Sequence, residues 1–241
     1  MVVVRISANS TSVKLVPRGL TALTGETAYW NNHKYSQGAQ IFRNGEVPEY
    51  IYQIREGAVR SYKLLSDGRR QIGAFHLPGD IFGVEIESVH RFTAEAIIDT
   101  TVWIARRHRL FENVDERELA DTRSIFELLH NSLEHAQNHL LLLGRQEAHE
   151  RVACFLLEMD RRLNKPAVIV LPMTRTDIAD YLGLTIEKVS RSLSAFRDRG
   201  IISFNCHREV ILKNRTKLAE VALSIHRYRH WMHPDRQRCS D

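Results

Sequence analysis

The chain has 241 residues, of which 43% are hydrophobic and 26% are charged, so we expect one or two domains with a buried core. No apolar run approaches the ~18 residues of a membrane span, and the first residues lack the apolar stretch of a signal peptide, so we expect a cytoplasmic protein without membrane contact. The three cysteines, Cys154, Cys206 and Cys239, include no close pair, which argues against a disulfide scaffold or a zinc site. A net charge of +5 and a pI near 9.2 permit nucleic-acid binding but do not demonstrate it.

The first 112 residues predict an arm followed by a β-domain. Residues 1–30 are weakly patterned and indicate an arm with one short helix. In residues 31–112 the segments between turns alternate apolar and polar positions and are rich in β-branched and aromatic residues. This pattern is typical of an antiparallel sandwich or jelly roll. Glycines recur there every 11 or 12 positions in turn-like surroundings, at Gly45, Gly57, Gly68 and Gly79.

Residues 113–144 predict one long helix. Their apolar residues repeat at alternating spacings of three and four, which is the period of a coiled-coil seam. A single amphipathic helix packed on its own domain would show the same pattern. We favour a homodimer because Leu140–Leu143 is apolar nearly all round. The candidate dimer-interface residues are Phe126, Leu129, Leu133, Ala136, Leu140 and Leu143.

After a further helix at 145–162, residues 174–200 have the layout of two short helices joined at a glycine. Thr174, with Asp177 three residues later, has the spacing of a capping box. Gly183 permits the positive φ that a tight turn between helices needs, and Thr185 is placed to cap the second helix. The expected buried stripes are Ile178, Tyr181 and Leu182 in the first helix and Val189, Leu193 and Phe196 in the second.

The outer face of the second helix carries Glu187, Ser190, Arg191 and Ser194. This face is polar, has short side chains near the N-terminus of the helix and includes an arginine. Such a face can form hydrogen bonds to base edges in a DNA major groove. An ordinary helical hairpin with a solvated outer face would look similar.

The flanking sequence favours DNA reading over that plain hairpin. Strands expected at 201–204 and 209–212, joined by a polar turn at 205–208, and a further strand at 168–171 would add a β-wing to the helix pair. Nine Lys and Arg stand against five Asp and Glu between Leu171 and Ala219, a charge excess suited to phosphate neutralisation. A protein that reads DNA as a symmetric dimer also needs an element that joins its two subunits at a fixed distance. This supports the interpretation of residues 113–144 as a dimer helix.

The order of these parts resembles the Crp/Fnr superfamily of transcription regulators. The similarity covers roughly residues 30–215 and is most specific in LPGDIFG, at Leu77–Gly83, and across Asp177–Phe196. Within the superfamily, the Leu184-Thr185-x-Glu187-x-x-Ser190-Arg191 pattern and the segment His90–Trp103 resemble the FixK branch. The resemblance implies an α+β fold: a β-roll at 31–112, a dimerisation helix at 113–144, a winged helix-turn-helix at 145–219 and a tail at 220–241.

The resemblance also implies which residues touch DNA, on a palindrome of the TTGAT–four bases–ATCAA type. Arg191 would bond guanine O6 and N7, Glu187 would accept from cytosine N4, and Ser190 would suit a thymine edge. Ile186 would touch a thymine methyl group. Ser192 stands where many relatives have an aliphatic residue, and we expect it to cost some packing. The residues placed to grip phosphate are Thr174, Arg175, Thr185 and Lys188.

The residues that members of the family usually use to bind a sensed ligand or metal are mostly absent from this sequence. Cyclic-nucleotide binders need an Arg-Ser pair where this chain has Phe92-Thr93, and Arg91, on a strand, would point to the other face. Iron–sulfur sensing needs N-terminal cysteines, and residues 1–153 contain none. His135 and His139, four residues apart, are too few for a closed metal site, and His76 is equally expected to be a turn residue. We therefore expect no cofactor and no metal.

We therefore expect an effector-independent, FixK-like transcription activator, and the resemblance implies that its targets are microaerobic, nitrogen-fixation or denitrification genes. The alternative is a ligand-gated or haem-gated regulator of the same superfamily. An enzyme has little support, because no nucleophile elbow, phosphate-binding glycine loop or metal triad is evident. Activation implies contact with RNA polymerase, for which Glu85–Arg91 is the family's usual region. Cys206, beside His207 and Arg208, is a candidate redox residue, and an incidental exposed thiol is the plainer interpretation.

Overall fold

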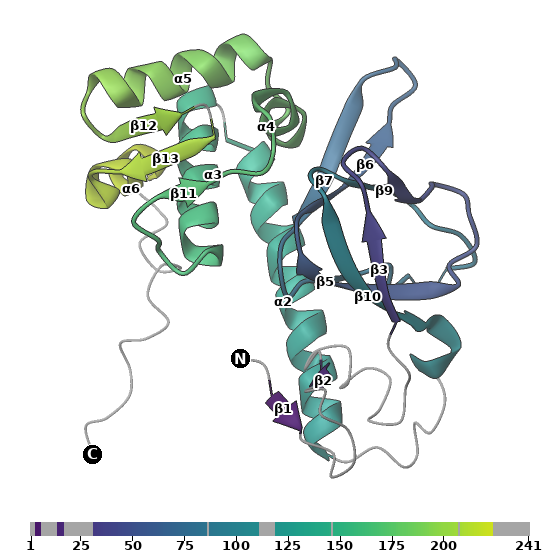
Figure 1. The fold of residues 1–241 in the computed structure, drawn as a ribbon. Coiled ribbons are helices and arrows are strands. Elements are labelled where there is room, and N and C mark those ends of the chain that lie inside the picture. The colour runs from purple at the N-terminus through teal and green to yellow at the C-terminus, as the bar shows by residue number, and fades with distance from the viewer. Residues whose placement is uncertain are drawn as a thin grey trace, which may run out of the picture. The chain divides into compact units, whose positions relative to one another are not determined.

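The computed structural model describes residues 3–5, 14–16, 31–85, 87–110, 119–145, 147–206 and 208–223 (Figure 1). They divide into two compact units, Met1–Gln137 and Asn138–Asp241. The first unit is mainly strand and the second mainly helix, which confirms the expected α+β class. None of the helices in the described ranges combines the length and hydropathy that crossing a bilayer would require.

The arm contains one antiparallel strand pair. Strands β1 (Val3–Arg5) and β2 (Lys14–Val16) place Val4 opposite Leu15. The short helix expected within residues 1–30 falls outside the described residues.

The β-domain consists of two four-stranded antiparallel sheets, in the orders β3-β10-β5-β8 and β4-β9-β6-β7 (Figure 1). Strands of both sheets supply a hydrophobic core cluster, in which Tyr52, Ile54 and Val102 meet Phe42 and Val59. Alternating apolar positions thus face the space between the sheets, as the sequence pattern predicts. The strands are β3 (Asn31–Tyr35), β4 (Gln40–Phe42), β5 (Tyr50–Glu56), β6 (Val59–Leu64), β7 (Arg70–His76), β8 (Ile81–Phe82), β9 (Thr93–Ala96) and β10 (Thr100–Arg106).

The four predicted glycine turns are confirmed, and each holds its glycine at a positive φ, between 82° and 99°. Gly57, between β5 and β6, shows why one of them needs glycine. A Cβ added there would lie 2.4 Å from Thr100 Oγ1, so no larger side chain fits without displacing β10.

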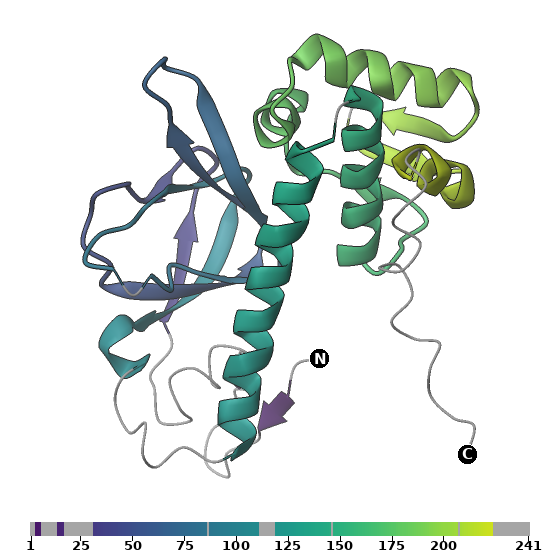
Figure 2. The same ribbon diagram turned by 180° about the vertical axis from the view of Figure 1, so that it is seen from behind.

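A 3-10 helix, η1 (Arg107–Leu110), follows the sheets, and the long helix α2 then runs from Leu119 to Leu143. Figure 2 shows α2 as one unbroken helix. It confirms the predicted helix at 113–144, although residues 111–118, where the prediction begins, lie outside the described residues.

The second unit is a helical domain with a three-stranded sheet in the order β11-β13-β12. Tyr181, Phe155 and Phe196 are among its largest fully buried side chains. The expected helices and strands are confirmed, but Cys206 was wrongly placed in the turn of the wing: it ends β12, opposite Glu209. The elements are α3 (Ala148–Arg162), β11 (Ile169–Val170), α4 (Arg175–Leu182), α5 (Ile186–Asp198), β12 (Ile202–Cys206), β13 (Glu209–Leu212) and α6 (Arg215–Ala222).

One ion pair joins the first and last helices of this domain. The Arg215 guanidinium donates to both oxygens of Asp160, at 2.8 and 2.9 Å. Asp160 is buried, and its hydrogen bond raises the pKa of Arg215 above the ordinary value. The pair therefore fixes the start of α6 against α3.

Candidate nucleic-acid interface

The first helix of the pair, α4, begins with a complete capping box. Thr174 Oγ1 accepts a hydrogen bond from the Asp177 amide at 3.1 Å, and Asp177 Oδ2 accepts from the Thr174 amide at 3.0 Å. The Thr174 hydroxyl also donates to Asp177 Oδ2 at 2.7 Å. Both donors of Thr174 therefore contribute to the capping box, while the residue itself is exposed.

The turn and the second cap follow the predicted chemistry. Gly183 ends α4 in the left-handed conformation, with φ 61° and ψ 40°. Thr185 then caps α5, because its side chain accepts from the Lys188 amide at 3.4 Å. The two helices are thus held by local hydrogen bonds that the sequence alone indicates.

Helix α5 has a buried face and an outward face. Val189, Leu193 and Phe196 are buried, as predicted. Ser192 is buried with them, and its hydroxyl donates to the Lys188 carbonyl at 2.8 Å, so this departure from the family pattern is satisfied within the helix.

The outward face of α5 carries the predicted base-reading residues. Glu187 and Arg191 are exposed, Ile186 is 41% exposed, and Ser190 is half-buried. A hydrogen bond from Thr185 lowers the pKa of the Glu187 carboxyl, with a further contribution from the Arg191 charge. Arg191 Nε lies 3.4 Å from the Glu187 carbonyl oxygen. The face therefore presents an ionised acceptor and a guanidinium one helical turn apart.

Arg175 links the two helices and the wing. Its Nη1 donates to Ser190 Oγ at 3.5 Å, and its guanidinium carbon lies 5.9 Å from the centroid of the Phe204 ring in β12. This arrangement places a permanent cation beside the outward face. The other predicted phosphate residues, Thr174, Thr185 and Lys188, are exposed.

Comparison with known proteins agrees with this geometry. Residues 150–221 match the Crp-like helix-turn-helix domain, and residues 32–117 match the cyclic nucleotide-binding domain. The nitrogen fixation regulation protein FixK of Rhizobium meliloti is 45% identical over 176 residues, which cover 73% of this chain and 80% of that protein. The FixK of Azorhizobium caulinodans is 43% identical over 190 residues, which cover 76% of each chain. The structure of FixK2 from Bradyrhizobium japonicum matches with a TM-score of 0.76 and 50% identity, over 80% of this chain and 97% of that one.

The chain belongs to the FixK-like branch of the Crp/Fnr superfamily.

The predicted dimer seam of this FixK-like chain lies largely on an exposed face of α2. Phe126, Leu133 and Leu140 are 68%, 57% and 71% exposed. Ala136 is exposed as well, whereas the side chain of Leu129 lies outside the described residues. Leu143 is half-buried, and its Cδ2 would lie 3.5 Å from a Cβ at Gly183, so it packs partly against its own helix-turn-helix. Leu141, which the seam prediction omitted, is 53% exposed.

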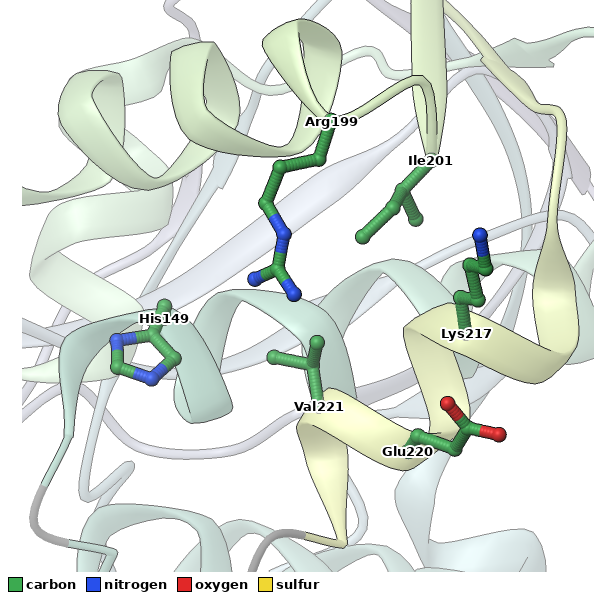
Figure 3. Close-up of a pocket in the computed structure, with 6 residues that line it drawn as sticks. All are labelled: His149, Arg199, Ile201, Lys217, Glu220 and Val221. Atoms are coloured by element: carbon green, nitrogen blue, oxygen red, sulfur yellow. The ribbon is translucent and has the colours of Figure 1, made fainter.

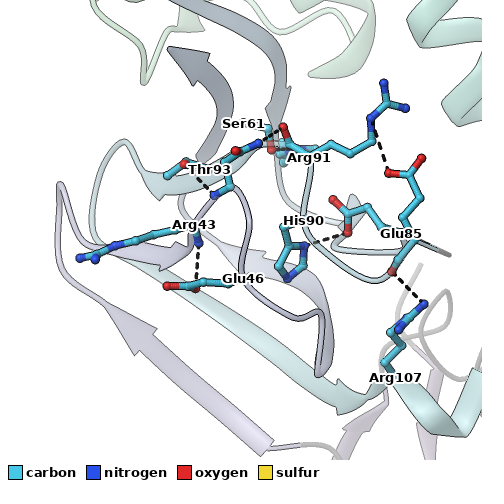
Figure 4. Close-up of polar contacts among 11 residues, drawn as sticks. Arg43, Glu46, Ser61, Glu85, His90, Arg91, Thr93 and Arg107 are labelled. Carbon is cyan, nitrogen blue, oxygen red and sulfur yellow. Dashed lines mark hydrogen bonds and ion pairs between the residues drawn. The ribbon is translucent and has the colours of Figure 1, made fainter.

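Phe92, which the sequence resemblance aligns with the arginine of nucleotide binders, packs against β7 in this FixK-like chain. A Cβ added to Gly73 would lie 3.0 Å from Phe92 Cε1, so the ring covers this glycine of β7. Thr93 Oγ1 accepts from the Asn44 amide at 3.1 Å (Figure 4). The expectation that Arg91 lies on a strand was wrong: it precedes β9 in a bend, is exposed, and pairs with Glu87 at 3.7 Å.

The loop Glu85–Arg91 is held at several points (Figure 4). Buried His90 stacks on Phe42 at 3.7 Å, and its Nδ1 lies 3.0 Å from Glu85 Oε2. Arg107 Nη2 donates to the Glu87 carbonyl at 3.3 Å. Between these anchors Val89 is 40% exposed.

The other candidate sensing residues have structural partners. His139 stacks on Tyr181, and His76, the last residue of β7, lies 2.8 Å from Ser61 Oγ. Within the ranges that the structure describes, no three metal-ligating side chains come together. Cys206 is exposed, whereas Cys154 is half-buried and its burial raises its pKa to about 11. Cys239 lies outside the described residues.

A surface pocket of about 410 Å³ lies beyond the C-terminal end of α5. Figure 3 shows the Arg199 guanidinium pointing between His149 and Val221, with Lys217 and Glu220 on α6. Sequence reasoning missed this pocket because its residues come from three separate segments. It lies at the opposite end of α5 from Glu187.

Proposed function

We propose that the chain is a FixK-type transcription activator that binds DNA as a homodimer, in the cytoplasm, at a TTGAT–four bases–ATCAA type palindrome. The observation that carries this proposal is the outward face of α5, which exposes Glu187 and Arg191 beside the Arg175 guanidinium. On this account Arg191 bonds guanine O6 and N7, Glu187 accepts from cytosine N4, Ser190 faces a thymine edge, and Ile186 contacts a thymine methyl group.

Phosphate contacts fix the register of the reading helix. We assign them to Thr174, Arg175, Thr185 and Lys188. Thr174 also holds the start of α4 through its capping box.

The homodimer is supported by the exposed apolar residues of α2. A set of exposed apolar side chains that includes Phe126, Leu133 and Leu140 is costly to leave in water, and a second copy of the helix would cover it. A twofold axis along this seam would set the two recognition helices about 34 Å apart, one turn of B-DNA.

We propose that DNA binding needs no small-molecule effector. Phe92 covers Gly73 where a cyclic phosphate would need a guanidinium, which supports this view. The names of the relatives support targets in nitrogen fixation, and we extend them to microaerobic and denitrification genes. Exposed Cys206, at the end of β12, is the residue through which oxidation would act. Diamide would couple its thiol to glutathione as a mixed disulfide, with diamide reduced to its hydrazine, and the glutathione carboxylates near phosphate would repel DNA.

Contact with RNA polymerase is assigned to the loop Glu85–Arg91. The His90–Glu85 and Arg107–Glu87 hydrogen bonds anchor it and leave Val89 and Arg91 exposed, which suits a fixed docking loop.

A ligand-gated or haem-gated regulator is the second candidate. The match of residues 32–117 to the cyclic nucleotide-binding domain favours it. Under this alternative, DNA binding would be weak until a small molecule occupied the β-roll.

A gel-shift of the untreated protein, with and without diamide, tests these assignments together. We expect specific binding to the palindrome without added ligand, no Soret absorbance and no retained ligand by mass spectrometry. Diamide with glutathione should weaken binding, and Cys206→Ser should remove that sensitivity. Specific binding that appears only after a ligand or haem is added would support the second candidate and overturn the first.

A further inference from the structure

The C-terminal end of α4 is held by side chains from outside the helix-turn-helix. The last carbonyls of a helix have no partner within it. Here the amides of Gly183 and Leu184 both return to the Ala179 carbonyl. The carbonyls of Tyr181 and Leu182 instead receive hydrogen bonds from His139 and Arg151.

His139, near the end of α2, makes two contacts with Tyr181. Its Nε2 lies 2.8 Å from the Tyr181 carbonyl oxygen, and its ring stacks on the tyrosine ring at 4.0 Å with an interplanar angle of 2°. Tyr181 is fully buried, so the histidine is fixed against a rigid part of the core. The two contacts together restrain both the position and the tilt of α4 beside the last turns of α2.

Arg151, on α3, bridges the end of α4 and the turn between α2 and α3. Its Nη1 donates to the Leu182 carbonyl at 2.9 Å, and its Nε donates to the Arg145 carbonyl at 2.9 Å. The positive charge lies at the negative end of the α4 dipole, which favours it there. One guanidinium thus holds two backbone segments that a single-donor side chain could not bridge.

We propose that His139 and Arg151 form a clamp that positions the reading helices against the end of the dimer helix and so sets the half-site spacing that the protein accepts. This inference rests on the proposed function. Because α4 and α5 are joined by a short capped turn, restraining α4 also restrains α5. In a dimer the clamp would act twice, once in each subunit. It would thereby fix the distance between the outward faces of the two α5 helices.

The test is binding to duplexes whose half-sites are separated by three, four or five bases. Each added base pair moves a half-site by about 3.4 Å and rotates it by roughly 35°. We expect the wild-type protein to prefer one spacing. His139→Leu and Arg151→Met should lower that preference about tenfold, because each removes a restraint on the reader, while the half-site sequence is still discriminated.

Conservative variants and thermal unfolding separate positioning from folding. His139→Gln keeps a donor of similar reach and should retain most of the preference, whereas Arg151→Lys keeps the charge without the bridge and should lose it. Thermal unfolding should stay within a few degrees of wild type. Variants that bind more weakly at every spacing by the same factor, or that match wild type throughout, would overturn the clamp.

Failure of the proposed function would look different. The wild-type protein would then fail to distinguish the palindrome from a scrambled duplex at every spacing. A selection from random DNA would supply the operator for the same spacing series if the half-site sequence differs from the proposed one.

Discussion

Arg175, the first residue of α4, donates through Nη1 to the hydroxyl oxygen of Ser190 on the outward face of α5, at 3.5 Å. The same guanidinium lies over the Phe204 ring of the wing. A residue assigned to the DNA backbone thus also contacts a residue assigned to a base. The relationship makes Arg175 an informative position for separating the two kinds of contact.

Arg175→Met should weaken DNA binding about equally on all sequences. A phosphate contact does not depend on the base sequence, so the loss should be the same on every duplex. Because one phosphate contact is lost, the slope of log affinity against log salt should fall by about 1. Gel-shift titrations over a salt series on the palindrome and on a scrambled duplex measure both quantities. An unchanged slope with relaxed preference at the base opposite Ser190 would show that Arg175 acts through the serine instead.

Arg191→Ala should weaken binding to the palindrome by ~1–3 kcal/mol and relax discrimination at its guanine. On the proposed account, the exposed guanidinium makes two hydrogen bonds to one base edge, which no small side chain replaces. Competition with operators substituted at that guanine measures the change. Arg197→Ala, at the far end of the same helix, is the control and should leave discrimination intact. An equal loss on every duplex would assign Arg191 to phosphate.

Leu133→Lys should dissociate the dimer. Burying two lysine charges in an apolar seam costs ~3 kcal/mol or more, so the sedimentation coefficient should fall toward that of the monomer and operator affinity should drop. Asn138→Lys adds the same charge at an exposed position off the seam and should change neither. A sedimentation profile of Leu133→Lys that matches wild type would overturn the seam.

The contact of Glu187 should be insensitive to pH in the neutral range. Its pKa is lowered by the Thr185 hydrogen bond, so the carboxylate persists above that pKa and is lost only as the pH falls through it, below the ordinary value of 4.5. The affinity ratio of wild type to Glu187→Gln should therefore stay constant from about pH 8 to 5.5. A ratio that falls within this window would contradict the assignment.

Asp160→Asn should lower the free energy of unfolding by ~1–3 kcal/mol, because it removes a charge-assisted pair from a buried carboxyl. Arg215 is 42% exposed, so solvent screening favours the lower part of that range. Denaturant unfolding at constant m-value measures the loss. Arg197→Gln removes a surface pair with Asp198 and should change stability by less than ~0.5 kcal/mol; a similar loss in both variants would show that burial is irrelevant.

The features that the sequence predicts well are caps and turns formed by residues close together in the chain. The capping box of Thr174 and Asp177, the left-handed Gly183 and the cap of Thr185 each involve residues within a few positions, so their spacing alone indicates the hydrogen bonds. The glycine turns of the β-roll are predictable for the same reason. The error at Cys206 is also local: β12 continues past Phe204 through a register shift, which no alternation pattern signals.

The features that the sequence does not predict are contacts between residues far apart in the chain. His139 and the Tyr181 carbonyl are 42 positions apart, and a pair of histidines four residues apart points to a metal before it points to a backbone oxygen. The capping box of Thr174 and Asp177 is predictable from the sequence, whereas the direct hydrogen bond between their side chains is seen only in the structure. The residue types indicate which groups can form hydrogen bonds, but the fold is needed to show which group each one contacts.

The most direct test is the stoichiometry and specificity of the untreated, ligand-free protein on DNA, measured by sedimentation with a labelled palindromic duplex and a scrambled duplex of equal length. We predict two chains on each palindrome, with no ligand added, and only weak, salt-sensitive association with the scrambled sequence. A protein that remains a single chain on DNA, or that binds both duplexes equally, would contradict the account.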